Sequence, residues 1–117
     1  TLQNADLYVH TAIIEIEAIA CMEAICCGAV PVICNSPRSA TRFFAIGDNS
    51  LYEQYDIEDL ASKIDYWFEH PEEKAERSKE YGATRRSFSQ RECMEKMEAM
   101  LTDAVRNKRK ELFIIAI

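Results

Sequence analysis

The sequence predicts an α/β fold, with a small Rossmann-like parallel sheet, flanking helices and a helix-rich C-terminal part. Two short apolar segments, residues 5–10 and 30–34, have the composition of buried strands. Between them, residues 16–27 are long enough for a helix of three turns that ends before Gly28. Strand, helix and strand in this order form a βαβ unit, whose two strands are parallel.

Every segment after Asp56 carries the signals of a helix. Asp56 is a suitable N-cap, and Pro71 is expected at the first position of the helix that follows. Ser89 and Glu92 form a capping box for the last helix. The helix after Asp56 has apolar residues at helical spacing: Ile57, Leu60, Ala61, Ile64 and Phe68.

The middle of the chain adds little sheet. Residues 35–45 are expected to form a polar turn and a short helix or loop, and residues 51–52 a brief edge strand. Two firm strands and one weak one are too few for four helices to cover. We therefore expect residues 1–117 to be one domain, the back half of a doubly wound domain whose other strands precede it.

The composition excludes several classes of protein. A formal net charge of -6 argues against general nucleic-acid binding, because phosphate contacts depend on clustered Lys and Arg. No apolar run reaches the roughly twenty residues of a membrane span. No signal peptide is expected from the first residues, although this sequence also lacks an initiator Met. The 5 cysteines include no CxxC pair, and only His10 and His70 could join them, so no metal site is expected. Buried, reduced thiols and a cytoplasmic setting are expected instead.

The expected helix at residues 16–27 contains carboxylates in an apolar setting. Glu17 and Glu23 lie within it, and Glu15 stands at its entrance. A buried carboxylate needs a ligand or a cation, whereas an exposed one could reach solvent, Arg38 or Arg42. On a helical wheel, Glu23 falls in one apolar stripe and is expected to be buried, together with Ile16, Ile19, Ala20 and Cys27.

Glu15 follows the first strand, at the sheet edge where open parallel sheets bind their ligands. The first amides of the helix, expected at residues 16–18, would be free to bind a phosphate, and Ala18 is small enough to let it approach. Glu15 and Glu23 are separated by about 12 Å along a helix. Carboxylates at this spacing could hold hydroxyl groups on both sides of a diphosphate, as in a nucleotide-sugar.

Residues 5–37, ADLYVHTAIIEIEAIACMEAICCGAVPVICNSP, resemble the E-x7-E region of retaining glycosyltransferases of family four, which have the GT-B fold. The two acids of the motif are Glu15 and Glu23. The resemblance extends over residues 5–100 and is nearest to bacterial lipid glucosyltransferases that act on diacylglycerol or cholesterol. It implies that this chain is the C-terminal, donor-binding part of such an enzyme. The motif continues through Ala24, Cys27, Gly28, Pro31 and Val32.

The resemblance also implies a role for each matching residue. Glu15 would act at the catalytic centre on the hydroxyls of the donor hexose, and Glu23 would bind the ribose hydroxyls of the nucleotide. The amides of Glu17, Ala18 and Ile19 would meet the sugar or the diphosphate. His10 would lie near the donor, or simply pack as a loop histidine. The sequence departs from the family at three places. Ala18 replaces the usual glycine after the first Glu, and GAVPV at residues 28–32 replaces the shorter GLPV. After the second strand, NSPRSATR replaces a glycine-bearing loop.

The implied enzyme is a retaining hexosyltransferase that needs no metal or other cofactor. It would transfer glucose from a nucleotide-diphospho-sugar such as UDP-glucose to a lipid or glycan acceptor. The acceptor-binding N-terminal domain and the upstream Arg and Lys of the family have no counterpart in this sequence, so the chain alone is expected to be inactive. Two alternatives remain: an inactive nucleotide-binding module, and a helical interaction domain with structural carboxylates.

The last helix is expected to pack an apolar stripe into a core. The sequence then ends in RNKRKELFIIAI, in which four basic residues and Glu111 precede the six apolar residues LFIIAI. This segment could contact an anionic membrane from the cytoplasmic side. Basic residues at a helix C-terminus, with an apolar tail packed on a partner domain, are the simpler explanation. The stripe consists of Cys93, Met94, Met97, Met100, Leu101 and Val105.

Overall fold

The computed structural model describes residues 2–115, except for the side chains of residues 3, 86, 88 and 109–115. The chain divides into two compact units, one up to Arg85 and one from Arg86 onward. In the first unit, the strands are β1 (Leu7–His10), β2 (Val30–Asn35) and β3 (Leu51–Glu53). Its helices are α1 (Ile19–Cys26), α2 (Ile57–Glu69) and α3 (Pro71–Ala83), and the second unit holds α4 (Gln90–Ile115).

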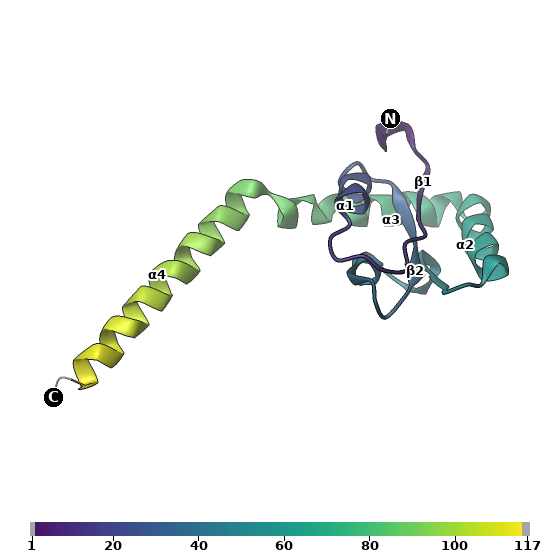
Figure 1. Ribbon diagram of the computed structural model, residues 1–117. Helices are drawn as coiled ribbons and strands as arrows, with labels where there is room; N and C mark the ends of the chain where they lie inside the picture. The colour runs from purple at the N-terminus through teal and green to yellow at the C-terminus, as the bar shows by residue number, and fades with distance from the viewer. Residues whose placement is uncertain (1, 116–117) are drawn as a thin grey trace. The chain divides into compact units, whose positions relative to one another are not determined.

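The three strands form one sheet in the order β1-β2-β3, and both pairs of neighbours are parallel. Leu7 lies opposite Val30 in the first pair, and Ile33 lies opposite Leu51 in the second. Helices α1 and α3 lie side by side and both contact β2, while α2 packs against β3 and α3 (Figure 1). The α/β fold with a small parallel sheet, flanking helices and a brief third strand is therefore confirmed.

Helix α1 begins at Ile19, three residues later than the sequence predicts. Ala18 occupies the N-cap position and makes no side-chain cap hydrogen bond. The C-terminal end agrees with the prediction, because Gly28 adopts a φ of 87° just beyond the helix. The amide of Gly28 donates to Ile25 O and that of Ala29 to Ala24 O, the hydrogen-bond pair of a Schellman motif.

The buried face of α1 differs from the expected stripe. Ile16 is 90% exposed, Ile19 is 55% exposed, and Glu23 is also exposed. The expected burial of Glu23 is wrong, because α1 turns the face of Cys21, Ala24 and Ile25 toward the core and leaves the face of Glu23 outside. The residues that contact the core instead are Ala18, Cys21, Ala24 and Ile25.

The core lies between β2 and the helices. Trp67 of α2 and Tyr81 of α3 are its largest fully buried side chains, joined by Ile33 and other residues of β2. The Trp67 indole satisfies its N–H by donating to Asn49 O at 3.0 Å. The stripe expected on α2 is wrong at Ile57, Ala61 and Phe68, which are exposed, and the buried residue of this helix is Trp67, which was not predicted.

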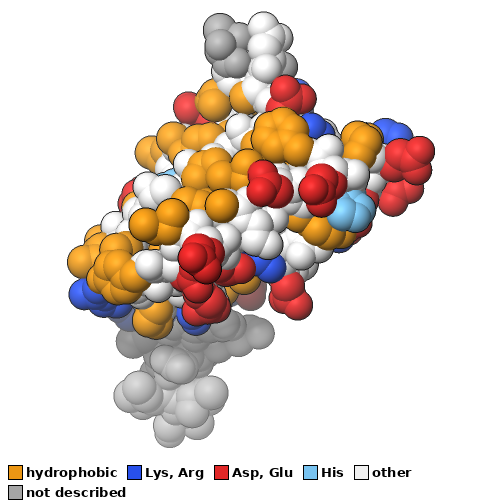
Figure 2. Space-filling view, turned by 90° about the vertical axis from the view of Figure 1, so that its right-hand side faces the viewer, with side chains coloured by type: hydrophobic (Ala, Val, Ile, Leu, Met, Phe, Trp, Pro, Cys, Tyr) orange, Lys and Arg blue, Asp and Glu red, His pale blue; other side chains and the backbone are white. Residues whose placement is uncertain are grey.

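Large apolar side chains remain exposed across the first unit, among them Ile14, Phe43 and Tyr55. Figure 2 shows hydrophobic side chains gathered on one face, with carboxylates between them. Patches of this kind commonly mark surfaces that bind another element or molecule. Among the helices that the structure describes, none is both long and apolar enough to cross a bilayer.

The second unit is a helix whose apolar stripe has no cover within the described residues. The stripe runs along α4, and the prediction that it packs into a core is wrong. The basic and apolar C-terminal segment was expected to contact a membrane or a partner domain. Its residues 116 and 117, and the side chains of residues 109–115, lie outside the described part of the chain. The exposed stripe residues include Met94, Met97, Met100, Leu101 and Val105.

All five cysteines are free thiols, but only two are buried. Burial raises the pKa of Cys21 to about 12, which keeps that thiol protonated and unreactive. Cys34 is also buried in the sheet, whereas Cys27 and Cys93 are exposed. The expectation of buried thiols is therefore confirmed for Cys34 of β2 and Cys21 of α1 only.

Candidate functional site

Two loops meet at the carboxyl edge of the sheet, one after β1 and one after β2. The first loop contains Glu15 and the second contains Arg38, Ser39 and Ala40. The amide of Glu15 donates to Arg38 O at 3.4 Å, and the amide of Ala40 donates to Glu15 O at 2.9 Å. Glu15 and Ser39 therefore form an isolated parallel bridge. Both polar backbone groups of Glu15 are held by the second loop.

A serine joins the same two loops through its side chain. The Ser36 hydroxyl donates to Ile13 O at 2.6 Å and accepts from the amide of Arg38 at 3.3 Å. Nearby, the hydroxyl of Ser39 is buried and has no hydrogen-bond partner among the described residues. Sequence reasoning did not single out either serine, and only the run of small polar residues in NSPRSATR could have indicated them.

His10 ends β1 inside a small polar cluster. Its Nε2 lies 3.4 Å from Thr41 Oγ1, and its Nδ1 lies 3.5 Å from the Tyr8 hydroxyl. Burial lowers the pKa of His10, and the negative charge of Glu15 opposes this shift in part. The neutral imidazole is favoured, so His10 can exchange hydrogen bonds with hydroxyl groups without adding a fixed positive charge.

The remaining residues expected at the donor lie just ahead of α1. The amide of Glu17 donates to Glu15 Oε1 at 3.1 Å, which brings this amide and the Glu15 carboxylate together. Ala18 is the N-cap and its carbonyl accepts from the amide of Met22, so the amides without a partner inside the helix begin at Ala18 and include Ile19. The prediction that residues 16–18 provide the first helical amides is therefore wrong for Ile16 and Glu17, and it holds for Ala18.

Glu23 lies farther along α1, in a hollow of about 510 Å³. Leu2, Cys26, Cys27 and Arg85 line this hollow with it, and none of the other predicted site residues does. The structure thus groups His10, Glu15 and Glu17 at the sheet edge and leaves Glu23 on the helix surface. Arg85 was not anticipated from the sequence, because nothing local relates it to a residue 62 positions earlier.

The arginines of the second loop have little connection to these acids. Arg38 is exposed, and the Arg42 guanidinium lies 4.9 Å from the centre of the Phe43 ring. The ion pairs found among the described side chains are Lys74–Asp6, Arg77–Glu80 and Arg91–Glu95. None of them includes Glu15 or Glu23, so the alternative of an internal arginine as the partner of Glu23 is not supported.

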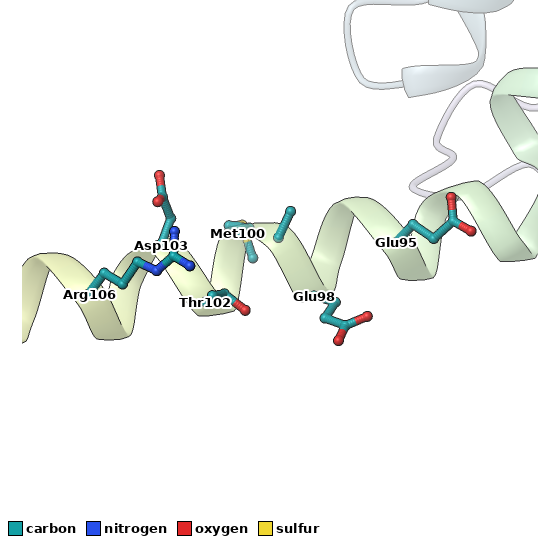
Figure 3. Close-up of a pocket in the computed structure, with 7 residues that line it drawn as sticks. Glu95, Glu98, Met100, Thr102, Asp103 and Arg106 are labelled. Carbon is teal, nitrogen blue, oxygen red and sulfur yellow. The ribbon is translucent and has the colours of Figure 1, made fainter.

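Other hollows lack the features of a site. The hollow shown in Figure 3, about 650 Å³, is lined by residues of α4 alone, and its labelled side chains project from several sides of that helix. A single helix cannot enclose a ligand, because pockets bury most of a ligand's surface. In the described part of the chain, no three His, Cys, Asp or Glu side chains are grouped so that they could hold a metal ion.

Comparison with known proteins gives two findings. The pattern of the family described as "Glycosyl transferases group 1" matches residues 1–85. The solved catalytic domain of cholesterol-alpha-glucosyltransferase from Helicobacter pylori is similar, with 48% sequence identity and a TM-score of 0.72. The similarity covers 75% of this chain and 55% of that chain, so the present chain corresponds to about half of its solved relative. A search of curated proteins finds no match.

Proposed function

Because this chain belongs to the glycosyl transferases of group 1 and is a fragment of the GT-B fold, we propose that it binds the donor of a retaining hexosyltransferase. The proposed reaction transfers glucose from UDP-glucose to a lipid acceptor. The observation that carries the proposal is the position of Glu15 at the carboxyl edge of the sheet, where its backbone is bonded to the loop after β2. Ligands of open parallel sheets bind at that edge.

The donor sugar is assigned to Glu15. Its backbone is held on both sides by the second loop, and its Oε1 accepts from the amide of Glu17. A carboxylate fixed in this way can accept hydrogen bonds from the hydroxyls of a hexose. His10 and the amides of Ala18 and Ile19 complete the proposed surroundings of the sugar and the diphosphate, since the dipole of α1 favours an anion at its start.

The nucleotide is assigned to Glu23 and the hollow beside it. The exposure of Glu23 leaves its carboxylate available to the two ribose hydroxyls, and a volume of about 510 Å³ is sufficient for part of a nucleoside. Arg85 in the lining adds a cation near this position. No metal or other cofactor is proposed to take part.

The acceptor is the part of the proposal that depends most on similarity. The solved relative is named for the transfer of glucose to cholesterol, and a lipid acceptor is proposed here by analogy. The acceptor site and the cations that neutralise the leaving diphosphate are proposed to lie outside this chain, which covers 55% of that relative. A cytoplasmic enzyme at a membrane surface is the corresponding setting.

Titration of the isotope-labelled chain with UDP, followed by amide NMR, tests donor binding. We expect saturable shifts in α1, and about tenfold weaker binding in Glu23→Ala, because a hydrogen bond to a charged group is lost. Glu76→Ala is the matched control, since Glu76 is an exposed carboxylate on α3. A folded chain that does not respond to millimolar UDP, or equal affinity in Glu23→Ala, would contradict the assignment.

Sugar transfer is measured with the full-length protein, UDP-glucose and vesicles that contain cholesterol or diacylglycerol. An α-linked glucolipid from the α-configured donor, identified by NMR of its anomeric proton, supports a retaining lipid glucosyltransferase. UDP binding without transfer to any acceptor would favour the inactive nucleotide-binding module.

A further inference from the structure

We propose that Ser36 is a positioning residue for Glu15. The buried hydroxyl of Ser36 holds the loop that contains Glu15 in its donor-binding position. This inference rests on the proposed function, because it takes Glu15 as the group that contacts the donor sugar. Ser36 does not itself meet the substrate. It acts through the backbone of two loops.

The Ser36 hydroxyl lies at the junction of these loops and is 0% exposed. It donates to Ile13 O, two residues before Glu15, at 2.6 Å. It accepts from the amide of Arg38 at 3.3 Å, and the carbonyl of Arg38 in turn accepts from the amide of Glu15. Ser36 is therefore connected to Glu15 by two routes, one along each loop.

Both backbone polar groups of Glu15 are hydrogen-bonded. Its amide and its carbonyl are both bonded to the second loop, through Arg38 O and the amide of Ala40. The second loop makes its own turn through a hydrogen bond from the amide of Ser39 to Ser36 O at 3.1 Å. Any shift of the second loop must therefore move Glu15, and the location of its carboxylate depends on Ser36.

Loss of the Ser36 hydroxyl would remove the donor to Ile13 O and the acceptor of the Arg38 amide at a part-buried junction. The two loops would then be free to separate, so that water replaces the lost partner. A change of this kind would displace the Glu15 carboxylate, and displacements of about 1 Å at a reacting centre have large effects on binding and catalysis.

A purely structural role for Ser36 is the alternative, and Ser50 provides the matched control. Ser50 is also 0% exposed, and its hydroxyl accepts from the Tyr81 hydroxyl at 3.0 Å. It lies in the same unit, immediately before β3 rather than in the two loops. Ser50→Ala thus removes a buried hydroxyl of the same kind without touching the hold on Glu15.

The first measurement is hydrogen exchange of the unliganded chain by NMR. We expect the amides of Glu15 and Ala40 to exchange about tenfold faster in Ser36→Ala than in the wild type, after correction for global stability. Ser36→Thr keeps a hydroxyl and should restore slow exchange. Ser50→Ala should leave these two amides unchanged once global stability is taken into account.

The second measurement compares the affinities for UDP-glucose and UDP in each variant. Glu15→Gln and Ser36→Ala should each weaken UDP-glucose binding severalfold while UDP binding stays within about twofold. The double variant Ser36→Ala/Glu15→Gln should show no further loss, because Ser36 acts through Glu15. Ser50→Ala should change both affinities alike.

The outcomes separate this inference from the proposed function. Unchanged exchange at Glu15 and Ala40 in Ser36→Ala, or an equal loss of UDP and UDP-glucose affinity, overturns the positioning role and leaves the function standing. Wild-type chain that binds neither nucleotide, or a Glu15→Gln variant with an unchanged affinity ratio, overturns the function and the inference together.

Discussion

The hydroxyl of Tyr81 donates to Ser50 Oγ at 3.0 Å and accepts from the amide of Ile46 at 2.6 Å. Through this one oxygen, α3 is joined to the segment that leads from β2 into β3. The contact with Ser50 lies in the interior, since Tyr81 and Ser50 are fully buried, and the contact with Ile46 is partly buried. We therefore expect Tyr81→Phe to leave the Ile46 amide without its acceptor and to destabilise the first unit by about 1–3 kcal/mol.

Urea denaturation of the variant and the wild type measures this difference, with Tyr55→Phe as the control. Tyr55 is 76% exposed, so its substitution should change the free energy of unfolding by less than about 0.5 kcal/mol. Equal stability of Tyr81→Phe and Tyr55→Phe would show that the buried hydroxyl contributes nothing.

Gly28 is required by the turn between α1 and β2. Its φ of 87° lies in the left-handed region, and an added Cβ would come within 3.2 Å of Ser78 Oγ. Gly28→Ala is expected to cost about 1–2 kcal/mol of unfolding free energy. Gly82→Ala is the matched control, because Gly82 lies within α3 and a Cβ there meets nothing within 4 Å. That control should be stabilised by about 0.5–1 kcal/mol. Thermal unfolding of both variants checks that the unfolding free energy falls in Gly28→Ala and rises in Gly82→Ala.

Asp56 caps α2 through its side chain. Its Oδ1 accepts from the amide of Asp59 at 2.9 Å, one of the amides that has no partner inside the helix. Asp56→Ala should lower the unfolding free energy by about 1 kcal/mol, whereas Asp56→Ser retains a capping oxygen and should lose less. Circular dichroism during thermal unfolding measures the midpoints of both variants and the wild type. A midpoint of Asp56→Ala equal to that of the wild type would argue against the cap.

His10 should make stability depend on pH in a defined direction. Its pKa is lowered chiefly by burial, so the unfolded chain binds the proton more readily than the folded chain. Stability from this group is fully present above the unfolded pKa of about 6.5 and is lost as the pH falls toward the folded value. Urea denaturation at pH 7.5 and pH 5.5 should show this loss, and His10→Gln should reduce it. A loss of the same size in both proteins would contradict the assignment.

The negative charge of Glu15 should have a measurable effect on the pKa of His10. The Glu15 carboxylate raises the pKa of His10 against the larger effect of burial. Glu15→Gln removes this charge, so the pKa of His10 should fall further. NMR titration of the imidazole Hε1 proton measures the change directly, and a pKa that rises or stays constant would mean that the two side chains do not interact.

Local chemistry determined a large part of this fold. The βαβ order, the cap at Asp56, the start of α3 at Pro71 and the end of α1 at Gly28 were all predicted from neighbouring residues, and the structure confirms them. Caps, left-handed glycines and apolar strands act over a few residues, so their signals can be read in a single sequence. The identities and spacing of Glu15 and Glu23 were equally evident, while their roles remain proposals.

Tertiary packing decided the rest. Residues 16–18 do not extend α1, and the backbone of Glu15 just ahead of them bonds instead to Arg38 and Ala40 from beyond β2. The direction in which α1 faces the sheet leaves Glu23 exposed, although its position on a helical wheel suggested burial. Ser36 acquires its place between the loops only when strands far apart in the sequence end at one edge. Such contacts depend on where distant segments meet, and no local pattern of residues records that.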